Sequence, residues 1–317
     1  MLEIRNEDIS FVVQGPVQAS HERKQIDGVT VDCLASIRHY FPRSTIILST
    51  WKGQKTEGLD YDHLLELDDP GQNSVFTHGK ELKLNNNRQL YSSHMGLKAV
   101  KTPYAAKIRT DNLLSGRGFV DLFAYYHDKD RVTDNHFFDS RVVTSSAFFI
   151  SHHRGAPNYF CKSDLFDFGL TSDLLKIWSD KPVKELHFKP KVGYKSRPPA
   201  TEQFLVLKWL SELMGIDLEV HNRVNDHAGL GEDFWERFIA NNLIIGTPEE
   251  IGLDTTVRFY QRGNLVFEYD LNDWQELAGF KPKTWSWKKT VRFVRNMVEN
   301  TYRRLYRFLP TQKTSKG

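Results

Sequence analysis

The sequence predicts an α/β protein with a central, mainly parallel sheet and helices on both of its faces. Along the first 110 residues, short apolar segments alternate with segments of helical spacing. Each apolar segment ends in turn-forming residues. With 39% hydrophobic residues among 317, the chain has enough apolar surface for a buried core. In such folds, ligands bind beyond the carboxyl ends of the parallel strands.

The first half of the chain supplies most of this pattern. Thr30 is placed to cap the first helix, and Pro42 stops it. Gln14, Asp69 and Asp111 each follow a predicted strand, so we expect them at one edge of the sheet. The expected strands are 9–13, 45–51, 63–67 and 104–109, and the expected helices are 30–41 and 85–100.

The second half is expected to complete the same compact unit. It contains a predicted strand at 141–150, a short helix at 174–178, a helix at 201–213 and a hairpin at 256–269. We expect three parts, which are a nucleotide-sugar-binding half over 1–115, an acceptor-binding half over 116–280 and a basic tail over 281–317.

The tail differs from the rest of the chain in charge. Residues 281–317 hold eleven basic residues and one acid, a net of +10, whereas the whole chain carries +3. Apolar residues recur there at three- and four-residue spacing, which predicts a basic amphipathic helix. We expect residues 285–309 to bind the anionic inner membrane surface. The alternative is a helix whose apolar stripe packs on the protein's own core. The stripe consists of Trp287, Val291, Val294, Val298, Tyr302, Leu305 and Leu309.

Cysteine usage and the chain start favour the cytoplasm. Cys33 and Cys161 are too few for a disulfide framework or a four-ligand zinc site, so we expect them to be core residues. The first ten residues lack the basic-then-apolar layout of a secretory signal. No apolar run reaches the ~18 residues needed to cross a bilayer. We therefore expect a cytoplasmic protein, peripheral on the inner face of the cytoplasmic membrane.

Missing motifs exclude several enzyme classes. The chain lacks the P-loop, the full dinucleotide fingerprint, H-E-x-x-H and G-x-S-x-G. What remains is Asp111 at a strand end, flanked by Thr110 and Asn112. A carboxylate there suits a divalent ion, Mg²⁺ or Mn²⁺, that holds a diphosphate. The alternative role for Asp111 is a turn or helix cap.

Seven sequence blocks carry a family resemblance. They are ISFVVQGPV, SIRHYFPRSTIILSTW, LDDPG, NNNRQLYSS, KIRTDN, DLFDFGLTSDLLKIW and TEQF, spread over residues 9–204. In their order and spacing they resemble the WavE lipopolysaccharide synthesis family. The resemblance implies a GT-A-like fold. It also implies a glycosyltransferase that moves a sugar from a nucleotide sugar to a lipopolysaccharide core, lipid-linked glycan or other surface-glycan acceptor.

The resemblance also implies roles for individual residues. Gln14, Gly15 and Pro16 would line the nucleotide pocket, and Asn87 and Arg88 would face its base or phosphates. Asn87 could instead cap a helix, and Arg88 could form a surface ion pair. The donor site would be completed by Arg109, Thr110, Asp111 and Asn112, with Asp111 as the metal or ribose carboxylate.

Two acids are candidates for the catalytic base. The resemblance places Asp167 and Glu202 toward the acceptor. An inverting transfer needs a carboxylate that takes the proton of the attacking hydroxyl, and either residue could do so. Glu202 could instead be a first-turn acid that the helix dipole favours. A retaining transfer would need no such base.

His227 is the remaining metal candidate. It lies in a polar loop, Asn225-Asp226-His227-Ala228-Gly229, and could close a metal shell together with Asp111. A lone histidine in such a loop is more often exposed. The donor nucleotide sugar and the metal are the expected ligands.

Two other functions fit part of the sequence. A sugar nucleotidyltransferase would share the sheet, but no G-x-G-T-R loop follows the first strand. A nucleic-acid-binding protein could use the basic tail. The rest of the chain is acidic, so we expect no nucleic-acid partner.

Overall fold

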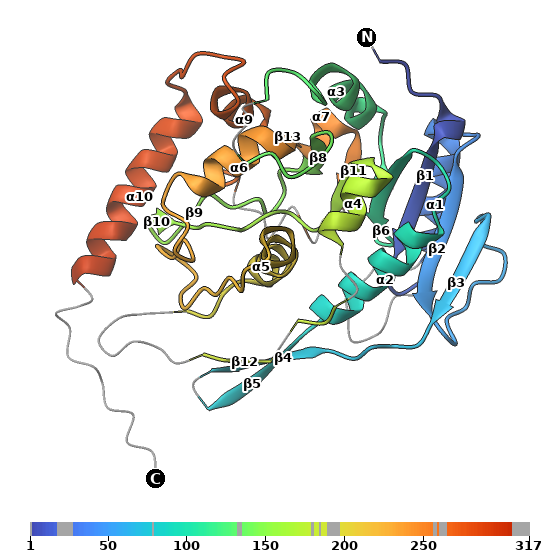
Figure 1. The fold of residues 1–317 in the computed structure, drawn as a ribbon, viewed down its shortest axis with the longest axis horizontal. Helices are drawn as coiled ribbons and strands as arrows, with labels where there is room; N and C mark the ends of the chain where they lie inside the picture. Colours follow the sequence, from blue (N-terminus) through green and yellow to red (C-terminus); the bar gives the residue numbers. More distant parts are fainter. Residues whose placement is uncertain are drawn as a thin grey trace.

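A seven-stranded sheet forms the centre of the molecule (Figure 1). The computed structural model describes residues 2–17, 28–77, 79–131, 135–178, 181–183, 185–188, 197–255, 259 and 265–305. In order across the sheet the strands are β13 (Leu243–Gly246), β8 (Val142–Ser145), β11 (Phe166–Leu170), β6 (Tyr104–Arg109), β1 (Ile9–Gln14), β2 (Thr45–Trp51) and β3 (His63–Leu67). Neighbours run parallel except β11, which is antiparallel to both β6 and β8. The mixed α/β fold with a mainly parallel sheet is therefore confirmed.

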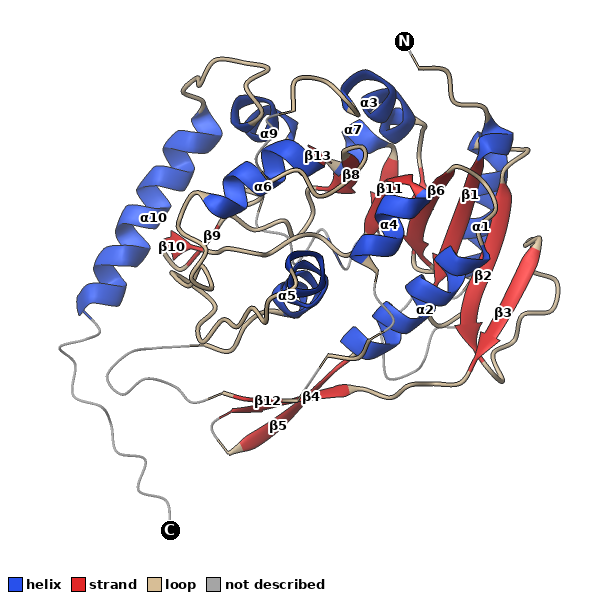
Figure 2. Ribbon diagram, in the orientation of Figure 1, coloured by secondary structure: helices blue, strands red, loops and turns tan. Residues whose placement is uncertain are grey.

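Helices cover both faces of this sheet (Figure 2). They are α1 (Val29–Tyr40), α2 (Asn86–Ala99), α3 (Gly118–Tyr126), α4 (Thr171–Ile177), α5 (Thr201–Met214), α6 (Phe234–Asn242), α7 (Pro248–Ile251), α9 (Leu271–Leu277) and α10 (Trp287–Leu305), with a 3-10 turn η1 at Asn6–Asp8.

Strand β1 shows how the two faces are filled. All six of its residues are buried, as its apolar sequence requires. Phe11 packs on Phe41, beyond the end of α1, and on Phe119 in α3, with ring centroids 5.0 and 6.3 Å away. Val12 points to the opposite face, as successive strand residues do. A Cβ on Gly96 of α2 would lie 2.3 Å from Val12 Cγ1, so α2 can approach the sheet only with glycine there.

Smaller sheets, which the sequence did not predict, extend from the core. A three-stranded sheet joins β12 (Leu186–His187), β4 (Asn73–Thr77) and β5 (Lys80–Leu84). Strand β5 is charged and exposed, so it lacks the apolar signal of the central strands. Strand β7 (Asn112–Leu114) pairs with β14 (Leu253–Thr255), and β9 (His152–His153) pairs with β10 (Ala156–Pro157).

Predicted and observed elements of the first half agree closely. Strands at 45–51, 63–67 and 104–109 have the predicted bounds. The cap at Thr30 was wrong, because α1 begins after Gly28. The Thr30 hydroxyl instead donates to the carbonyl oxygens of Val17 and Thr110, at 2.8 and 3.2 Å.

In the second half, the strand expected at 141–150 is shorter. Strand β8 ends at Ser145, and the chain then turns through Phe148, whose φ is +66°. The hairpin expected at 256–269 lies mostly outside the described residues. Strands β8, β11 and β13 continue the sheet that the first half begins.

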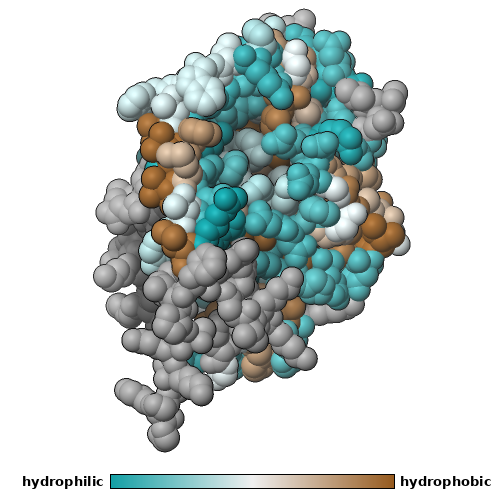
Figure 3. Space-filling view, turned by 90° about the vertical axis from the view of Figure 1, so that its left-hand side faces the viewer, coloured by the Kyte–Doolittle hydropathy of each residue, from teal (hydrophilic) through white to brown (hydrophobic). Residues whose placement is uncertain are grey.

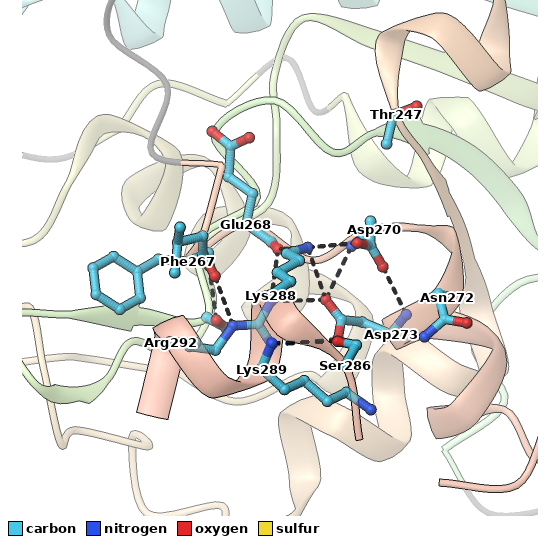
Figure 4. Close-up of polar contacts among 12 residues, drawn as sticks. Thr247, Phe267, Glu268, Asp270, Asn272, Asp273, Ser286, Lys288, Lys289 and Arg292 are labelled. Atoms are coloured by element: carbon cyan, nitrogen blue, oxygen red, sulfur yellow. Dashed lines mark hydrogen bonds and ion pairs between the residues drawn. The ribbon is translucent and has the colours of Figure 1, made fainter. Parts of the chain in front are cut away.

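Helix α10 lies with its polar side inward. Lys288 Nζ donates to Asp270 and Asp273, at 2.6 and 3.1 Å, and Arg292 Nη2 donates to Asp273 at 2.8 Å (Figure 4). Lys289 pairs with Glu276. These acids come from α9 and the residue before it. Ion pairs therefore hold the N-terminal half of α10 to the body.

The large apolar side chains of α10 lie outward instead. Brown groups of atoms, with paler ones among them, are visible on this side of the molecule in Figure 3. The outer apolar face consists of Trp285, just before the helix, and Trp287, Phe293, Val294, Met297, Val298, Tyr302 and Leu305, which are 45–81% exposed. The alternative prediction, that the apolar stripe packs on the protein's own core, is therefore wrong for these residues. In the described part of the chain, no helix is long and apolar enough to span a membrane.

Candidate functional site

Hydrogen bonds join the segments that follow the parallel strands β1 and β6. Thr110 N–H donates to the carbonyl of Gln14 at 3.0 Å, and the Thr110 hydroxyl donates to that of Pro16 at 2.8 Å. Gln14 is buried, and its Oε1 accepts from Ser92 Oγ of α2 at 2.9 Å. The residues expected around a nucleotide thus come together at one edge of the sheet.

Gly15 is required in the turn that follows β1. Its φ is +121°, which side chains disfavour, and a Cβ there would lie 3.1 Å from Thr110 Oγ1. Gly15 is itself buried, and Pro16 beside it is half-buried. The turn therefore packs closely against Thr110 and presents Pro16 toward the surface.

Asp111 and Arg109 form a two-bond ion pair at the end of β6. Arg109 Nε donates to Asp111 Oδ1 at 2.8 Å, and Nη2 donates to Oδ2 at 2.9 Å. The Asp111 side chain is only 5% exposed and that of Arg109 20%. The pair sets a fixed, neutralised carboxylate and a partly exposed guanidinium beside the Gln14–Pro16 turn.

The described donor set fits a metal ion poorly. Across the described ranges, no three His, Cys, Asp or Glu side chains gather as metal ligands. Both Asp111 oxygens accept from Arg109, and a cation would have to displace that guanidinium. His227 accepts from the Gly231 N–H through Nδ1, at 3.2 Å, and packs on Tyr159. We therefore derive no step through a metal.

Asn112 follows in a buried position. It is 0% exposed, and neither its side-chain nitrogen nor its oxygen has a hydrogen-bond partner among the described residues. It begins β7, opposite Thr255. Its amide thus remains a candidate for ligand contact.

Asn87 and Arg88 hold local structure. Asn87 Oδ1 accepts from the Val183 N–H at 2.7 Å. Arg88 Nε donates to both carboxylate oxygens of Asp69, at 2.8 and 3.0 Å, and Arg88 also contacts Asn85. This pairing lowers the pKa of Asp69. The surface ion pair that was the alternative role for Arg88 is therefore present in the structure.

Asp167 lies inside the sheet, away from solvent. It is 0% exposed, and its carboxylate accepts from Lys162 Nζ at 2.6 Å and Trp178 Nε1 at 3.0 Å. Because the carboxylate is completely buried, an acceptor hydroxyl cannot reach it in this conformation. The expectation that Asp167 faces an acceptor is corrected to a buried ion pair.

Lys107 and Asp164 lie between Asp167 and Arg109 and were missed from the sequence. Lys107 is fully buried and donates to the Asp164 carbonyl, and burial lowers the pKa of its ammonium to about 7. The Asp164 carboxylate lies 3.8 Å from Arg109 Nη1. Charged residues within apolar strand sequence, as in YAAKIR, are the signal that could have identified them.

Glu202 stands at the mouth of an open pocket. The pocket has a volume of about 540 Å³ and lies between the β4–β5 hairpin and the start of α5, with Thr77, Leu82, Arg197 and Arg223 in its wall. Burial, and next the charge of Asp164, raise the pKa of Glu202 to about 7. A carboxylate with this pKa can accept a proton near neutral pH.

The start of α5 is held in place by two buried amides. Gln203 Nε2 donates to the carbonyls of Tyr159 and Arg223, at 2.8 and 3.1 Å, and its Oε1 accepts from the Ala200 N–H at 2.9 Å. Asn86 Nδ2, in α2, donates to the Thr201 carbonyl at 2.9 Å. These bonds fix Glu202 relative to α2 and its neighbouring loops.

The two cysteines are core residues, as expected. Cys33 and Cys161 are both buried and free. Burial raises the pKa of each thiol well above its usual value. Neither is a candidate nucleophile.

Comparison with known proteins identifies a family. A family model described as WavE lipopolysaccharide synthesis matches residues 9–307. The match includes all of α10, which the resemblance blocks did not reach. No curated protein matches the chain. Among solved structures, the chain is similar to 4-diphosphocytidyl-2C-methyl-D-erythritol synthase from Anaerococcus prevotii, at 10% identity and a TM-score of 0.30, over 74% of this chain and 94% of that one. A likeness this distant carries no argument about the site.

Proposed function

Because the chain belongs to the WavE lipopolysaccharide synthesis family, we propose that it is a glycosyltransferase. It takes a sugar from a nucleotide-sugar donor and places it on a lipopolysaccharide core or other surface glycan. The observation that carries the proposal is the meeting of a glycine turn and the Asp111–Arg109 pair at one sheet edge, with Asp164 lying near both Arg109 and Glu202.

The donor occupies the ends of β1 and β6 in this proposal. The nucleotide lies against the Gly15–Pro16 turn, and Asp111 accepts hydrogen bonds from its ribose. Arg109 supplies a fixed positive charge for the leaving diphosphate, since its guanidinium is partly exposed. Charge stabilisation by an oriented guanidinium needs no reorganisation during the reaction.

Glu202 acts as the base of an inverting transfer. The acceptor oxygen attacks the anomeric carbon, the bond from that carbon to the diphosphate oxygen breaks, and Glu202 takes the hydroxyl proton. Its raised pKa matches the operating pH, and the open pocket beside it gives an acceptor access. Asp167, in contrast, is completely buried and paired with Lys162, so no acceptor has access to it.

Helix α10 places the enzyme on the cytoplasmic face of the membrane in the same proposal. Its outer apolar face is exposed along the helix, and tryptophans at its start suit a bilayer interface. The basic residues Lys288, Lys289 and Arg292 are paired with acids of the body. They are therefore unavailable to the phosphates of a nucleic acid. Lipid contact thus comes mainly from apolar insertion.

A thermal-shift screen of nucleotide sugars tests the proposal. A donor that binds the folded state stabilises it by mass action, about 2.7 kcal/mol at 100 times Kd. We expect one nucleotide sugar to raise Tm in the native chain and in Asp121→Asn, an exposed control, but not in Asp111→Asn. No shift with any nucleotide sugar would overturn the donor site. Product formation from a nucleoside triphosphate and a sugar phosphate would instead favour a nucleotidyltransferase.

A further inference from the structure

Three arginines from separate segments meet beside Glu202. Arg154 is in the β9–β10 turn, Arg197 precedes α5, and Arg223 lies in the loop that follows α5. The Arg223 N–H donates to the Arg197 carbonyl at 3.1 Å. Gln203 binds the carbonyl of Arg223 and that of Tyr159, two residues beyond the β9–β10 hairpin. The backbone therefore fixes the three segments against one another.

The guanidinium groups are close enough to act on their neighbours. Burial, and then the charges of Arg223, Arg197 and Arg154, lower the pKa of His153 to about 4. Burial and the other two arginines also lower the pKa of Arg197. Each guanidinium group thus raises the free energy of the charged form of its neighbours.

Among the described residues, the charge of Arg223 reaches Glu202, where it partly offsets the rise in the pKa of that acid, but a single carboxylate does not balance three guanidinium groups. Arg154, Arg197 and Arg223 are half-buried, and within the described ranges none forms an ion pair with a carboxylate. The Nε of Arg223 is buried and lacks a hydrogen-bond partner there.

An arrangement of this kind is unfavourable unless a ligand completes it. A half-buried guanidinium without a partner loses hydration, and like charges add repulsion. Elsewhere in the chain, arginines at comparable depth have partners, as Arg109 and Arg292 do. Arginine forks match the oxygens of phosphate and carboxylate groups.

The location of the arginines indicates which of the two substrates, donor or acceptor, carries the anion. Arg197 and Arg223 line the same pocket of about 540 Å³ as Glu202. The donor side lies in the other direction, through Asp164 to Arg109 and Asp111. A group bound by the arginines would therefore lie on the acceptor side of the proposed base.

We propose that Arg154, Arg197 and Arg223 bind an oxyanion of the acceptor, a phosphate or carboxylate group on the glycan. This assignment rests on the proposed glycosyltransferase function. The anion positions the acceptor so that its hydroxyl meets Glu202. The enzyme then selects acidic over neutral glycans.

Inorganic phosphate is the first probe. At constant ionic strength, with chloride replaced, we expect phosphate to raise Tm of the full chain. Arg197→Ala and Arg223→Ala should raise the phosphate Kd at least tenfold, and Arg237→Ala, an exposed arginine on α6, should not change it. An unchanged phosphate Kd in both site variants would overturn the proposal.

Stability without ligand gives a second, independent readout. Because the arginines repel one another, Arg154→Ala and Arg197→Ala should keep or raise Tm at low ionic strength. A fall of many degrees in both would mean that the arginines serve the fold. Arg197→Gln keeps most of the side-chain volume and separates lost packing from lost charge.

Transfer assays separate this proposal from the function on which it rests. With a lipopolysaccharide core oligosaccharide tested before and after phosphate removal, Arg197→Ala should raise the acceptor KM for the phosphorylated form and leave nucleotide-sugar protection unchanged. If Arg197→Ala loses that protection, the arginines hold the donor, and the acceptor assignment is wrong. If no nucleotide sugar protects the native chain while phosphate still binds the arginines, the glycosyltransferase function fails and the anion site remains.

Discussion

The guanidinium of Arg109 donates two hydrogen bonds to the carboxylate of Asp111, two residues along the chain, at 2.8 and 2.9 Å. Asp111→Asn keeps the shape but removes the charge and one acceptor. We expect transfer to fall at least a hundredfold, because donor ribose and Arg109 both lose their partner. Circular dichroism should show a folded chain, and Asp121→Asn on α3 is the matched control. Full turnover by a folded Asp111→Asn would remove Asp111 from the site.

The same pair predicts how the enzyme responds to chelation. Arg109 already occupies both Asp111 oxygens, so we expect EDTA treatment to leave the transfer rate unchanged. Arg109→Lys should then lower kcat, since a point charge cannot reproduce the two-bond contact. Loss of activity in EDTA with recovery on adding Mg²⁺ or Mn²⁺ would contradict this and restore Asp111 as a metal ligand.

Glu202 predicts a pH-dependent rate. With a pKa raised to about 7 by burial and by Asp164, the carboxylate is mostly protonated below that pH and mostly ionised above it. The rate of transfer should therefore rise with pH and level off above pH 7. Glu202→Gln should lower kcat by ~10²–10⁴ and keep donor binding. An unchanged kcat would leave Glu202 as a helix-start acid and favour a retaining mechanism.

The same residue gives a stability test with a defined sign. The pKa of Glu202 rises from 4.5 to about 7 on folding, so the folded state binds its proton more tightly than the unfolded state does. Its contribution to stability therefore decreases as pH rises from about 4.5 to 7. Glu202→Gln should raise Tm relative to the native chain at pH 8 and match it at pH 4. Equal Tm at both pH values would contradict the raised pKa.

Asp167 should affect stability rather than chemistry. Asp167→Asn leaves Lys162 buried without its counter-charge, which typically costs about 3–5 kcal/mol. We expect a large fall in Tm, measured by thermal unfolding, with the kcat of the remaining folded enzyme unchanged at low temperature. The pair variant Asp167→Asn with Lys162→Met should recover part of the loss. A variant of native Tm that lacks activity would instead support Asp167 as the base.

The sequence predicted the sheet because its signals are local. Strands such as Thr45–Trp51 are short, mainly apolar runs that end at turn residues. Their bounds could therefore be predicted from the run and its flanking residues. The hairpin of β4 and β5 escaped because β5 is charged and exposed and β4 has only two large apolar residues, so neither strand is a continuous apolar run. Its role depends on forming the pocket wall opposite Glu202, which only the tertiary structure shows.

The candidate site could be predicted only in part, for a similar reason. Gln14, Thr110 and Asp111 follow strands, and parallel strands bring their ends to one edge. Asp167 also lies in a strand, β11, but this strand runs antiparallel to β6. No local sequence pattern indicated that reversed direction. Arg154 and Arg223 are 69 residues apart in the sequence, and their meeting depends on hydrogen bonds of Gln203 to two loops.

Helix α10 provides the last prediction, because its polar contacts and its outer apolar face can be changed separately. Removing residues 281–317 would leave Asp270 and Asp273 without Lys288 and Arg292. Truncation would therefore change membrane binding and protein stability at the same time.

The triple variant Phe293→Ser, Val298→Ser and Leu305→Ser changes only side chains that are 58–60% exposed, and we expect it to keep its Tm. It should lose most binding to phosphatidylglycerol vesicles in a flotation assay, since each apolar side chain that leaves the interface costs binding free energy. Ile216→Ser, a comparably exposed residue after α5, should bind as the native chain does. Because three basic residues of α10 are already paired, raising the salt concentration should weaken native binding only partly. Unchanged flotation of the triple variant would show that the outer apolar face does not contact lipid, and an altered sedimentation mass would assign it to a protein partner instead.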